Sequence, residues 1–188
     1  IHDAEVLAST AVEGHFDVIL AAGGDGTVNQ VVNGILRGRE SHVDLPVVGV
    51  VPIGTGNDLA RGLNLKEDIN QLLMLLNNFE PEDIDIGKVV YTTAKGDQDY
   101  RYFVNVVDIG MGPEVVKKVM RRDQIFGAAL SYYISILSTF TSYKPMVASA
   151  NTPDWEWSGK LRTLAIANGK YYGNGLCIAP DAQPNDRV

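Results

Sequence analysis

Two glycine-rich segments carry the residue types that bind phosphate. The first, residues 23–27 (GGDGT), follows the apolar run 16–22 and precedes a helical pattern. Glycine lets the backbone take positive φ and lets a phosphate approach without a Cβ in the way, and free N–H groups at a helix start attract anions. The segment is therefore a candidate phosphate cradle. The alternative is a tight strand-to-helix turn capped by Asp25 or Thr27.

The second segment repeats this arrangement one strand later. Residues 53–58 (IGTGND) lie between the apolar run 46–52 and a short helical pattern at 58–63. Ligands of an open parallel sheet bind beyond the carboxyl ends of its strands, so two such loops on neighbouring strands converge on one crevice. The pair predicts a nucleotide site. Neither segment fits the lysine-containing phosphate loop or the GxGxxG dinucleotide fingerprint, which excludes those two kinds of site.

Three aspartates accompany the glycine-rich segments and indicate a divalent cation. A carboxylate beside a phosphate is repulsive unless a cation such as Mg²⁺ bridges the two, directly or through water. Asp25 lies in the first segment, and Asp58 ends the second, where a helix N-cap is its alternative role. Asp85 lies in the run 83–92, which predicts a strand. An inward carboxylate on a strand is costly unless it is paired or bound to metal.

The elements around these residues predict two domains. Up to residue 80, short apolar runs alternate with helical patterns that include 27–36 and 66–79. This alternation is typical of a parallel sheet covered by helices on both faces. After residue 82 the chain becomes β-rich, with predicted strands at 83–92, 100–109, 144–150 and 160–167. We therefore predict an α/β domain over residues 1–81 and a β-rich domain over 82–188.

The composition is that of an ordinary soluble globular chain. The 188 residues are 45% hydrophobic and 21% charged, which excludes disordered and collagen-like chains. The net charge of −7 argues against general nucleic-acid binding, because phosphate contacts need a basic face. The single cysteine, Cys177, favours a reducing, cytoplasmic compartment. The chain opens on a helical pattern with Val6, Leu7 and Val12 as its apolar positions, so we expect it to be a piece of a longer protein.

A basic cluster precedes an uncharged helical stretch at residues 124–143. The stretch is too rich in Ser, Thr and Tyr to predict a membrane span, and burial inside the domain is our first interpretation. It has a stripe of small hydroxyl residues, Ser131, Ser135, Ser138 and Ser142, and an apolar stripe, Ile125, Ala129, Tyr132, Ile136 and Phe140. The cluster, Lys117, Lys118, Arg121 and Arg122, would attract an anionic bilayer by about 1 kcal/mol per basic residue. A solvated helix face is its alternative role.

Together, the two glycine-rich segments resemble the catalytic domain of diacylglycerol kinases and related bacterial lipid kinases. The matching residues are 23–29 (GGDGTVN) and 52–61 (PIGTGNDLAR). Weaker matches extend over nearly the whole chain, at 84–87 (IDIG), 103–105 (FVN), 143–145 (YKP), 167–173 (ANGKYYG) and 179–182 (APDA). The resemblance implies an α/β nucleotide-binding domain with a parallel sheet, then a sandwich-like β domain, with the active site in the cleft between them.

The resemblance implies transfer of the γ-phosphoryl group of ATP to a lipid hydroxyl, with Mg²⁺ as cofactor. It places the nucleotide at Gly23, Gly24, Asp25, Gly26, Thr27, Val28, Asn29, Gln30, Gly54, Thr55, Gly56 and Asn57. It assigns the arrangement of the catalytic Mg²⁺ to Asp25, Asp58 and Asp85. Gln30 stands where the family often has glutamate, so a hydrogen-bonding role remains there while a charged role is lost.

A structural Mg²⁺ site near residue 188 is also implied by the resemblance. Its candidate ligands are the Asp186 carboxylate and the main-chain oxygens of Gln183 and Val188. Arg187 replaces the family's usual glycine, and its positive charge repels a metal ion. The family's first strand and its C-terminal segment with the acidic general base are absent from these residues. We therefore expect residues 1–188 alone to transfer no phosphate.

Several alternatives stay open at this point. Nicotinamide-dinucleotide kinases share a GGDGT segment, although residues 54–61 argue against them. A sphingoid-base or ceramide kinase differs mainly in its acceptor, and a non-catalytic nucleotide- or lipid-binding relative is the alternative outside enzymes. A diacylglycerol-like acceptor is our first expectation; a polyprenol, phosphatidylglycerol or a sphingoid base are the others. Because a lipid kinase takes its acceptor from a bilayer, we expect peripheral membrane contact from the cytoplasm. A homodimer is possible.

Overall fold

The computed structural model describes residues 3–37, 45–121 and 128–187, with side chains except at 119–121 and 128–133. Two compact units make up the chain. One joins Ile1–Val106 to Ala167–Val188, and the other is Val107–Ile166. The first unit is therefore discontinuous in the sequence, with the second unit between its two parts.

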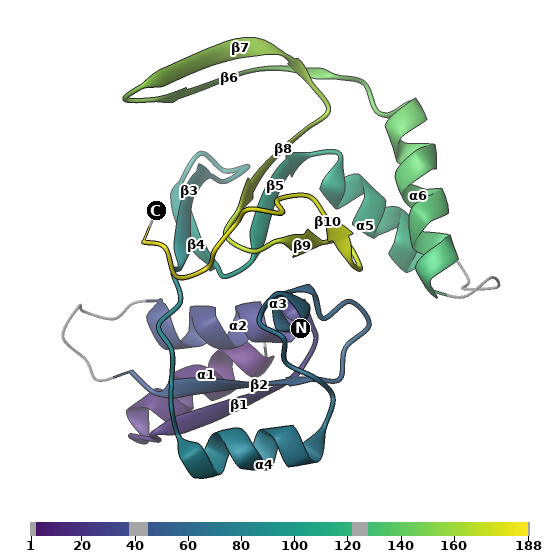
Figure 1. The fold of residues 1–188 in the computed structure, drawn as a ribbon. Coiled ribbons are helices and arrows are strands. Elements are labelled where there is room, and N and C mark those ends of the chain that lie inside the picture. The colour runs from purple at the N-terminus through teal and green to yellow at the C-terminus, as the bar shows by residue number, and fades with distance from the viewer. Residues whose placement is uncertain (1–2, 38–44, 122–127, 188) are drawn as a thin grey trace. The chain divides into compact units, whose positions relative to one another are not determined.

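A parallel pair of strands forms the centre of the first unit (Figure 1). Strand β1 (Val18–Gly23) pairs with β2 (Val47–Pro52) along its full length. The pairing sets Gly23 opposite Pro52, so both strands end at the same edge. Both strands were predicted to within two residues, and the parallel sheet of the expected α/β domain is confirmed.

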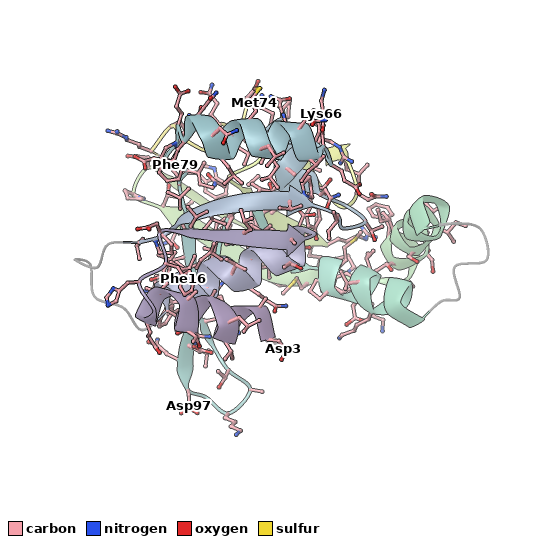
Figure 2. All side chains as sticks on the ribbon, turned by 90° about the horizontal axis from the view of Figure 1, so that it is seen from below. Asp3, Phe16, Lys66, Met74, Phe79 and Asp97 are labelled. Carbon is pink, nitrogen blue, oxygen red and sulfur yellow. The ribbon has the colours of Figure 1, made fainter. Side chains whose placement is uncertain are left out.

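Helices cover both faces of this strand pair. Helices α1 (Asp3–Glu13) and α2 (Asp25–Leu36) pack together on one face, and α4 (Ile69–Asn78) lies on the other. Figure 2 shows the same layers from below, with Met74 on α4 and Asp3 on α1 at opposite sides of the strands. The apolar core lies mainly between α1, α2 and the strands, and its buried members are Ala8, Val12, Ala21, Val28, Val31, Val32, Ile35, Leu59 and Val104.

Helix α1 turns a different face to this core from the one its apolar residues predict. Val6 and Leu7 are 63% and 69% exposed, whereas Ala8 and Val12 are buried. The reason is the close contact with α2, where a Cβ on Gly34 would collide with Ala8 and with the α1 backbone. Only a face with a small residue at this crossing brings the two helices together.

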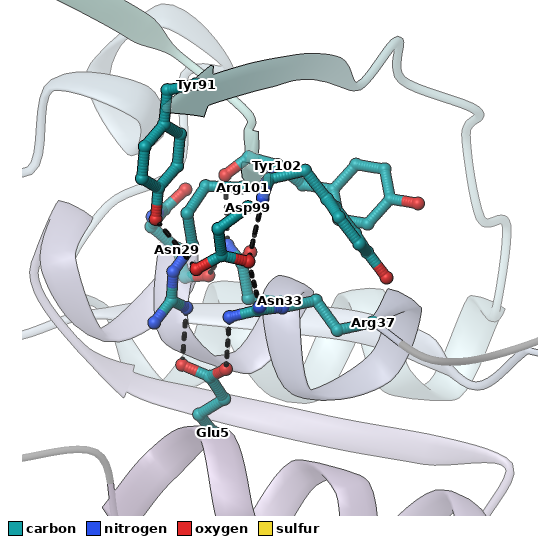
Figure 3. A network of polar contacts seen from close by, with 9 residues as sticks. Glu5, Asn29, Asn33, Arg37, Tyr91, Asp99, Arg101 and Tyr102 are labelled. Atoms are coloured by element: carbon teal, nitrogen blue, oxygen red, sulfur yellow. Dashed lines mark hydrogen bonds and ion pairs between the residues drawn. The ribbon is translucent and has the colours of Figure 1, made fainter. Parts of the chain in front are cut away.

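The β3–β4 hairpin is attached to α1 and α2 by polar side chains (Figure 3). Strand β3 (Gly87–Thr92) pairs antiparallel with β4 (Gln98–Phe103). The fully buried Asn33 of α2 bonds the β4 backbone, accepting from Tyr102 N at 3.0 Å and donating to Tyr102 O at 2.9 Å. Because one amide side chain satisfies both backbone groups of Tyr102, it substitutes for a neighbouring strand.

Three ion pairs complete this attachment (Figure 3). Arg101 contacts Glu5 at 2.6 Å, and Arg37 contacts Asp99 at 2.7 Å and Glu5 at 3.7 Å. The hydrogen bond from Arg101 to the Glu5 carboxylate raises the pKa of the guanidinium. The Tyr100 N–H and the Tyr91 hydroxyl both donate to Asp99, and they lower the pKa of this carboxyl.

Three of the predicted β segments differ from the structure. Residues 100–109 divide between β4 and β5 (Val106–Gly110), because the Asn105 carbonyl accepts from the N–H groups of Asn168 and Gly169. Residues 160–167 divide between β7 (Trp155–Leu161) and β8 (Thr163–Ala167) at Arg162. Strand β3 begins at Gly87, so placing Asp85 on a strand was wrong; its N–H donates to Pro184 O at 2.6 Å instead of to a strand.

The second unit combines two strand pairs with two helices. Strand β6 (Met146–Thr152) pairs antiparallel with β7, and β5 pairs with β8. Helices α5 (Gly112–Arg121) and α6 (Ala128–Ser142) pack against each other. Residues 124–127 of the predicted long helix, with Ile125, lie outside the described residues. Within the described ranges, every helix is too short or too polar to cross a membrane.

Candidate active site

The carboxyl ends of β1 and β2 bring the two glycine-rich segments into contact. A Cβ on Gly24 would lie 3.3 Å from the Gly54 Cα, and a Cβ on Gly54 would meet the Gly24 backbone more closely still. Two backbones approach this closely only where both residues lack a Cβ. The sequence prediction that these segments lie side by side is therefore correct.

Asn57 holds the second segment in shape. Its Oδ1 accepts from Gly54 N at 3.0 Å, and its Nδ2 donates to Pro52 O and Gly54 O at 2.8 Å each. Asn57 itself takes φ +53, a left-handed conformation that asparagine tolerates better than most residues. It is also the N-cap residue of α3 (Asp58–Gly62), so the N-cap role considered for Asp58 was wrong.

The start of α2 is open at the first segment. Gly24 is its N-cap, and no described side chain donates or accepts a capping hydrogen bond there, so the capping roles considered for Asp25 and Thr27 were wrong. Gly26 is exposed, and among the described residues no atom lies within 4 Å of the position its Cβ would take. Uncapped N–H groups at a helix start attract an anion. This end of α2 can therefore accept a phosphate group.

Asp25 joins the first segment to the second. Its Oδ2 accepts from Asp58 N at 3.0 Å and its Oδ1 accepts from Leu59 N at 2.8 Å. The carboxylate thus satisfies two free N–H groups at the start of α3 and not those of its own helix. A negative charge at this position is also favoured by the α3 dipole.

Asp58 joins the second segment to a third one, residues 171–175. Asp58 is 4% exposed, and its carboxylate accepts from Asn174 N at 2.8 Å and from Gly175 N at 2.7 Å. Arg61 Nη1 donates to the same carboxylate at 2.6 Å, and the guanidinium lies 5.8 Å from the centre of the Tyr171 ring. The chain of contacts therefore runs from Asp25 through α3 and Asp58 to the third segment.

Sequence reasoning missed this third segment as part of the site. Residues 167–173 were noted only as a family match, without a partner. A local signal was present, because Asn174 and Gly175 take φ +67 and +96, and a Gly-Asn-Gly sequence favours such a turn. The sequence does not indicate that the turn contacts Asp58, which lies more than a hundred residues earlier.

Short strands hold the third segment together. Strands β9 (Tyr171–Tyr172) and β10 (Leu176–Cys177) pair antiparallel around this turn. Asn105 Nδ2 donates to Tyr171 O at 2.9 Å, which fastens β9 to the end of β4. The turn is thus fixed by β9 and β10 as well as by Asp58.

Asp85 makes its contacts elsewhere. Its Oδ2 accepts from Arg187 N at 2.7 Å, and its carbonyl accepts from Asn168 Nδ2 at 2.8 Å. The structure therefore places Asp85 beside the segment predicted to hold a structural metal ion. Asp25 and Asp58 instead share the surroundings of Gly56, where an added Cβ would lie 3.2 Å from Asp25 Oδ2 and 3.8 Å from Asp58 Oδ2.

The predicted structural metal site is only partly described. Gln183 and Asp186 are exposed, and Val188 lies outside the described residues. Arg187 takes φ +64, a conformation that favours glycine, and glycine is the residue that the family usually has at this position. Across residues 3–37, 45–121 and 128–187, no group of three His, Cys, Asp or Glu side chains is arranged to hold a metal ion. The ligand set that includes main-chain oxygens stays a prediction.

The remaining predicted nucleotide residues occupy different environments. Val28 is 3% exposed and packs in the core, so its side chain supports α2 from within. Thr55 is exposed, and Thr27, Asn29 and Gln30 are half-buried near the start of α2. These nucleotide contacts, the domain boundary at residues 81 and 82 and the location of the active site in a cleft between domains stay predictions.

Family models and known relatives match this chain over nearly all of its length. Residues 1–89 match the model described as "Diacylglycerol kinase catalytic domain", and residues 105–188 match "YegS C-terminal NAD kinase beta sandwich-like domain". A "Probable lipid kinase YegS-like" of Yersinia enterocolitica is 29% identical over 184 residues, which are 98% of this chain and 59% of that protein. The protein of the same description in Serratia proteamaculans is 32% identical over 172 residues, covering 89% of this chain and 52% of that protein. The chain thus spans little more than half the length of these relatives.

Solved structures show the same fold. A putative diacylglycerol kinase from Bacillus anthracis strain Sterne superposes with a TM-score of 0.72 at 21% identity, over 98% of this chain and 58% of that one. A second structure from that strain, described as a diacylglycerol kinase, gives a TM-score of 0.69 at 22% identity. The expected fold, a parallel α/β part followed by a sandwich-like β part, is confirmed.

Proposed function

Because residues 1–89 match the diacylglycerol kinase catalytic domain and the relatives named above are described as probable lipid kinases, we propose that the chain contains the nucleotide-binding part of an ATP-dependent lipid kinase. The observation that carries the proposal is the contact of two glycine-rich loops at the carboxyl ends of β1 and β2, beside the open start of α2. This is where an open parallel sheet binds its ligand. A diacylglycerol-like lipid is the acceptor that we propose.

The loops would bind the phosphates of ATP through their backbones. The N–H groups at the start of α2 point away from the helix, and Gly26 lets an oxyanion approach them closely. The exposed Thr55 hydroxyl lies on the facing loop and can donate to the same phosphate group. Positioning of this kind supplies most of the catalysis in phosphoryl transfer.

Asp25 and Asp58 fit a divalent cation held through its water molecules. Each carboxylate oxygen here already accepts a backbone N–H, but a carboxylate has about four lone-pair sites and can also accept from metal-bound water. A bound Mg²⁺ would neutralise part of the charge of the phosphates. The two residues have a second role that does not depend on metal, because they fix the three segments of the site.

The reaction that we propose exchanges one phosphorus–oxygen bond for another. The lipid hydroxyl oxygen bonds to the γ-phosphorus, and the bond from that phosphorus to the oxygen bridging to the β-phosphate breaks. ADP leaves with the electron pair, and the hydroxyl proton passes to a carboxylate base. We propose that this base lies outside residues 1–188, so that these residues alone bind nucleotide without transferring phosphate.

The test uses the whole protein that contains this chain, γ-labelled ATP and a total lipid extract. We expect a labelled phospholipid with the mobility of phosphatidic acid. A labelled product that comigrates with a sphingoid-base phosphate or ceramide phosphate would replace the acceptor that we propose. Nucleotide binding without any labelled lipid would favour a non-catalytic relative and refute the kinase.

A further inference from the structure

Helix α6 buries hydroxyl groups and exposes hydrocarbon. Ser135 and Thr139 are 0% and 1% exposed, and Thr139 Oγ1 donates to Ser135 O at 2.7 Å. The large apolar side chains Ile134, Leu137 and Phe140 are 38%, 67% and 50% exposed. A surface helix of a soluble domain has the opposite arrangement, with apolar residues inside and polar residues outside. The predicted burial of this helix inside the domain therefore holds at Ser135 and Thr139 and was wrong at these three apolar residues.

Polar contacts with α5 fix α6 in this orientation. Lys118 Nζ on α5 donates to Ser138 Oγ at 3.3 Å and to Ser142 Oγ at 3.1 Å. These serines lie on the side of α6 that also carries the buried Ser135 and Thr139, so this side faces α5 and the rest of the unit, although Ser142 at its end is exposed. Ile134, Leu137 and Phe140, here called the α6 apolar face, occupy the other side. The exposure of this face thus follows from the packing.

Positive charge borders the α6 apolar face. The Arg162 guanidinium lies 4.8 Å from the centre of the Phe140 ring. Residues 107–166 carry seven Lys and Arg against five Asp and Glu, a net charge of +2, although the whole chain has a net charge of −7. The unit that exposes apolar side chains is thus also the basic part of an acidic protein.

An apolar helix face bordered by cations has the chemistry of an interfacial helix. Such a helix lies in the plane of the membrane surface, with its hydrocarbon between the lipid headgroups and with cations near the lipid phosphates. Arginine suits the border because its long side chain reaches toward the phosphates. A neutral protein partner would give no reason for positive charge here.

We propose that the α6 apolar face inserts into the surface of an anionic bilayer, with Arg162 close to the lipid phosphates. The proposal rests on the proposed function in one respect, since the acceptor lipid would come from this bilayer. It changes the role of the basic cluster predicted from sequence. Lys117 pairs with Glu114 at 2.7 Å and Lys118 is bound to α6, whereas the Arg121 side chain and Arg122 lie outside the described part of the chain. In this proposal, apolar insertion therefore adds to the attraction predicted for the cluster.

The test measures sedimentation of the whole protein with vesicles made of equal parts of phosphatidylglycerol and phosphatidylcholine, without ATP. The triple variant Ile134→Gln, Leu137→Gln, Phe140→Gln removes the α6 apolar face, and we expect its vesicle partition to fall about 100-fold. The matched control is Ile69→Gln, Leu73→Gln, Phe79→Gln, which changes the same three residue types at or just after α4, where they are 65%, 51% and 49% exposed. We expect the control variant to bind vesicles as the wild type does.

A second measurement tests directly whether the α6 apolar face enters the bilayer. In the single variant Leu137→Trp, we expect the new tryptophan fluorescence to be quenched by brominated lipid in anionic vesicles. Absence of quenching, or equal vesicle binding by the wild type and the triple variant, would overturn the proposal. So would a wild-type dimer that the triple variant converts to a monomer, because the face would then belong to a second copy.

The failure of this proposal and the failure of the proposed function can be told apart. Vesicle binding requires neither nucleotide nor turnover. A protein that binds anionic vesicles through α6 but labels no lipid would refute the kinase and keep the membrane face. A protein that labels lipid but does not bind vesicles through α6 would refute the membrane face and keep the kinase.

Discussion

We expect replacement of Gly26 by alanine to weaken phosphate binding without destabilising the fold. A methyl group at this position meets no described atom within 4 Å, and Gly26 has an ordinary negative φ, so the folded protein accepts it without strain. Alanine in a helix is favoured over glycine by about 0.5–1 kcal/mol, so we expect Gly26→Ala to leave the free energy of unfolding unchanged or to raise it. The same methyl group would stand where a phosphate oxygen approaches the start of α2. Loss of one hydrogen bond to a charged group costs about 1.5–3 kcal/mol, which corresponds to a rise in the dissociation constant for ATP of about 10- to 150-fold.

The assay is isothermal titration of ATP into the whole protein, with urea unfolding of the same samples. Gly62→Ala is the matched control, because among the described residues its added Cβ would also have no atom within 4 Å and it ends α3 away from the first loop. We expect the control to bind ATP as the wild type does. Unchanged ATP affinity in Gly26→Ala would refute the reasoning that phosphate binds at the start of α2.

Three other perturbations follow from the described contacts. Asp58→Asn removes a buried charge that accepts from two N–H groups and Arg61, and we expect it to lower the free energy of unfolding by about 1.5–3 kcal/mol in urea titrations. A loss of less than about 0.5 kcal/mol, which is within experimental error, would contradict the role of Asp58 as the link to residues 171–175. Asn33→Ala leaves both backbone groups of Tyr102 without their partner, and we expect a loss of about 2–4 kcal/mol in the same assay, with Asn70→Ala on the exposed α4 as a control that stays near the wild type. The pKa of Asp99 is lower in the folded protein than in the unfolded chain, where it is about 4. The stabilisation from the Asp99 carboxylate is therefore fully present above about pH 4 and is lost as the pH falls through the pKa of the folded protein. We therefore expect Asp99→Asn to flatten the decline of the melting temperature below about pH 4. Parallel declines in the variant and the wild type would show that Asp99 has no such effect.

Local patterns predicted the elements that carry the two glycine-rich loops. The apolar runs before each loop and the glycines at their ends indicate strands followed by helices, and β1, α2 and β2 start and end within two residues of these predictions. Contact between the loops also followed, because parallel neighbouring strands end at one edge of a sheet. These features depend on residues close together in the sequence.

The roles of the aspartates could not be predicted in the same way. The residues between Asp83 and Thr92 have a strand-like apolar pattern because Ile84 and Ile86 pack against the core, although the chain there is not a strand. Asp85 is held by Pro184 and Arg187, about a hundred residues later. Contacts at this sequence separation leave no local signal.

Helix α6 illustrates a different limit. Its two stripes could be recognised from the helical period, but the period does not indicate which stripe faces the protein. The Lys118 amine reaches two serines of the hydroxyl stripe. Of the apolar-stripe members with described side chains, Ile136 is half-buried and Phe140 is 50% exposed, so the boundary of the exposed face does not follow the predicted stripes.

The discontinuity of the first unit has a consequence for synthesis on the ribosome. Domains generally begin to fold while the chain is being made, from the N-terminus onward. Residues 1–106 emerge first and can form the strand pair and both glycine-rich loops. The N–H groups of Asn174 and Gly175 emerge only after residues 107–166 have been added, so until then the Asp58 carboxylate lacks these two donors. The nascent protein therefore completes its candidate active site late, and a ribosome that stops before residue 174 releases a chain whose two loops lack their third segment.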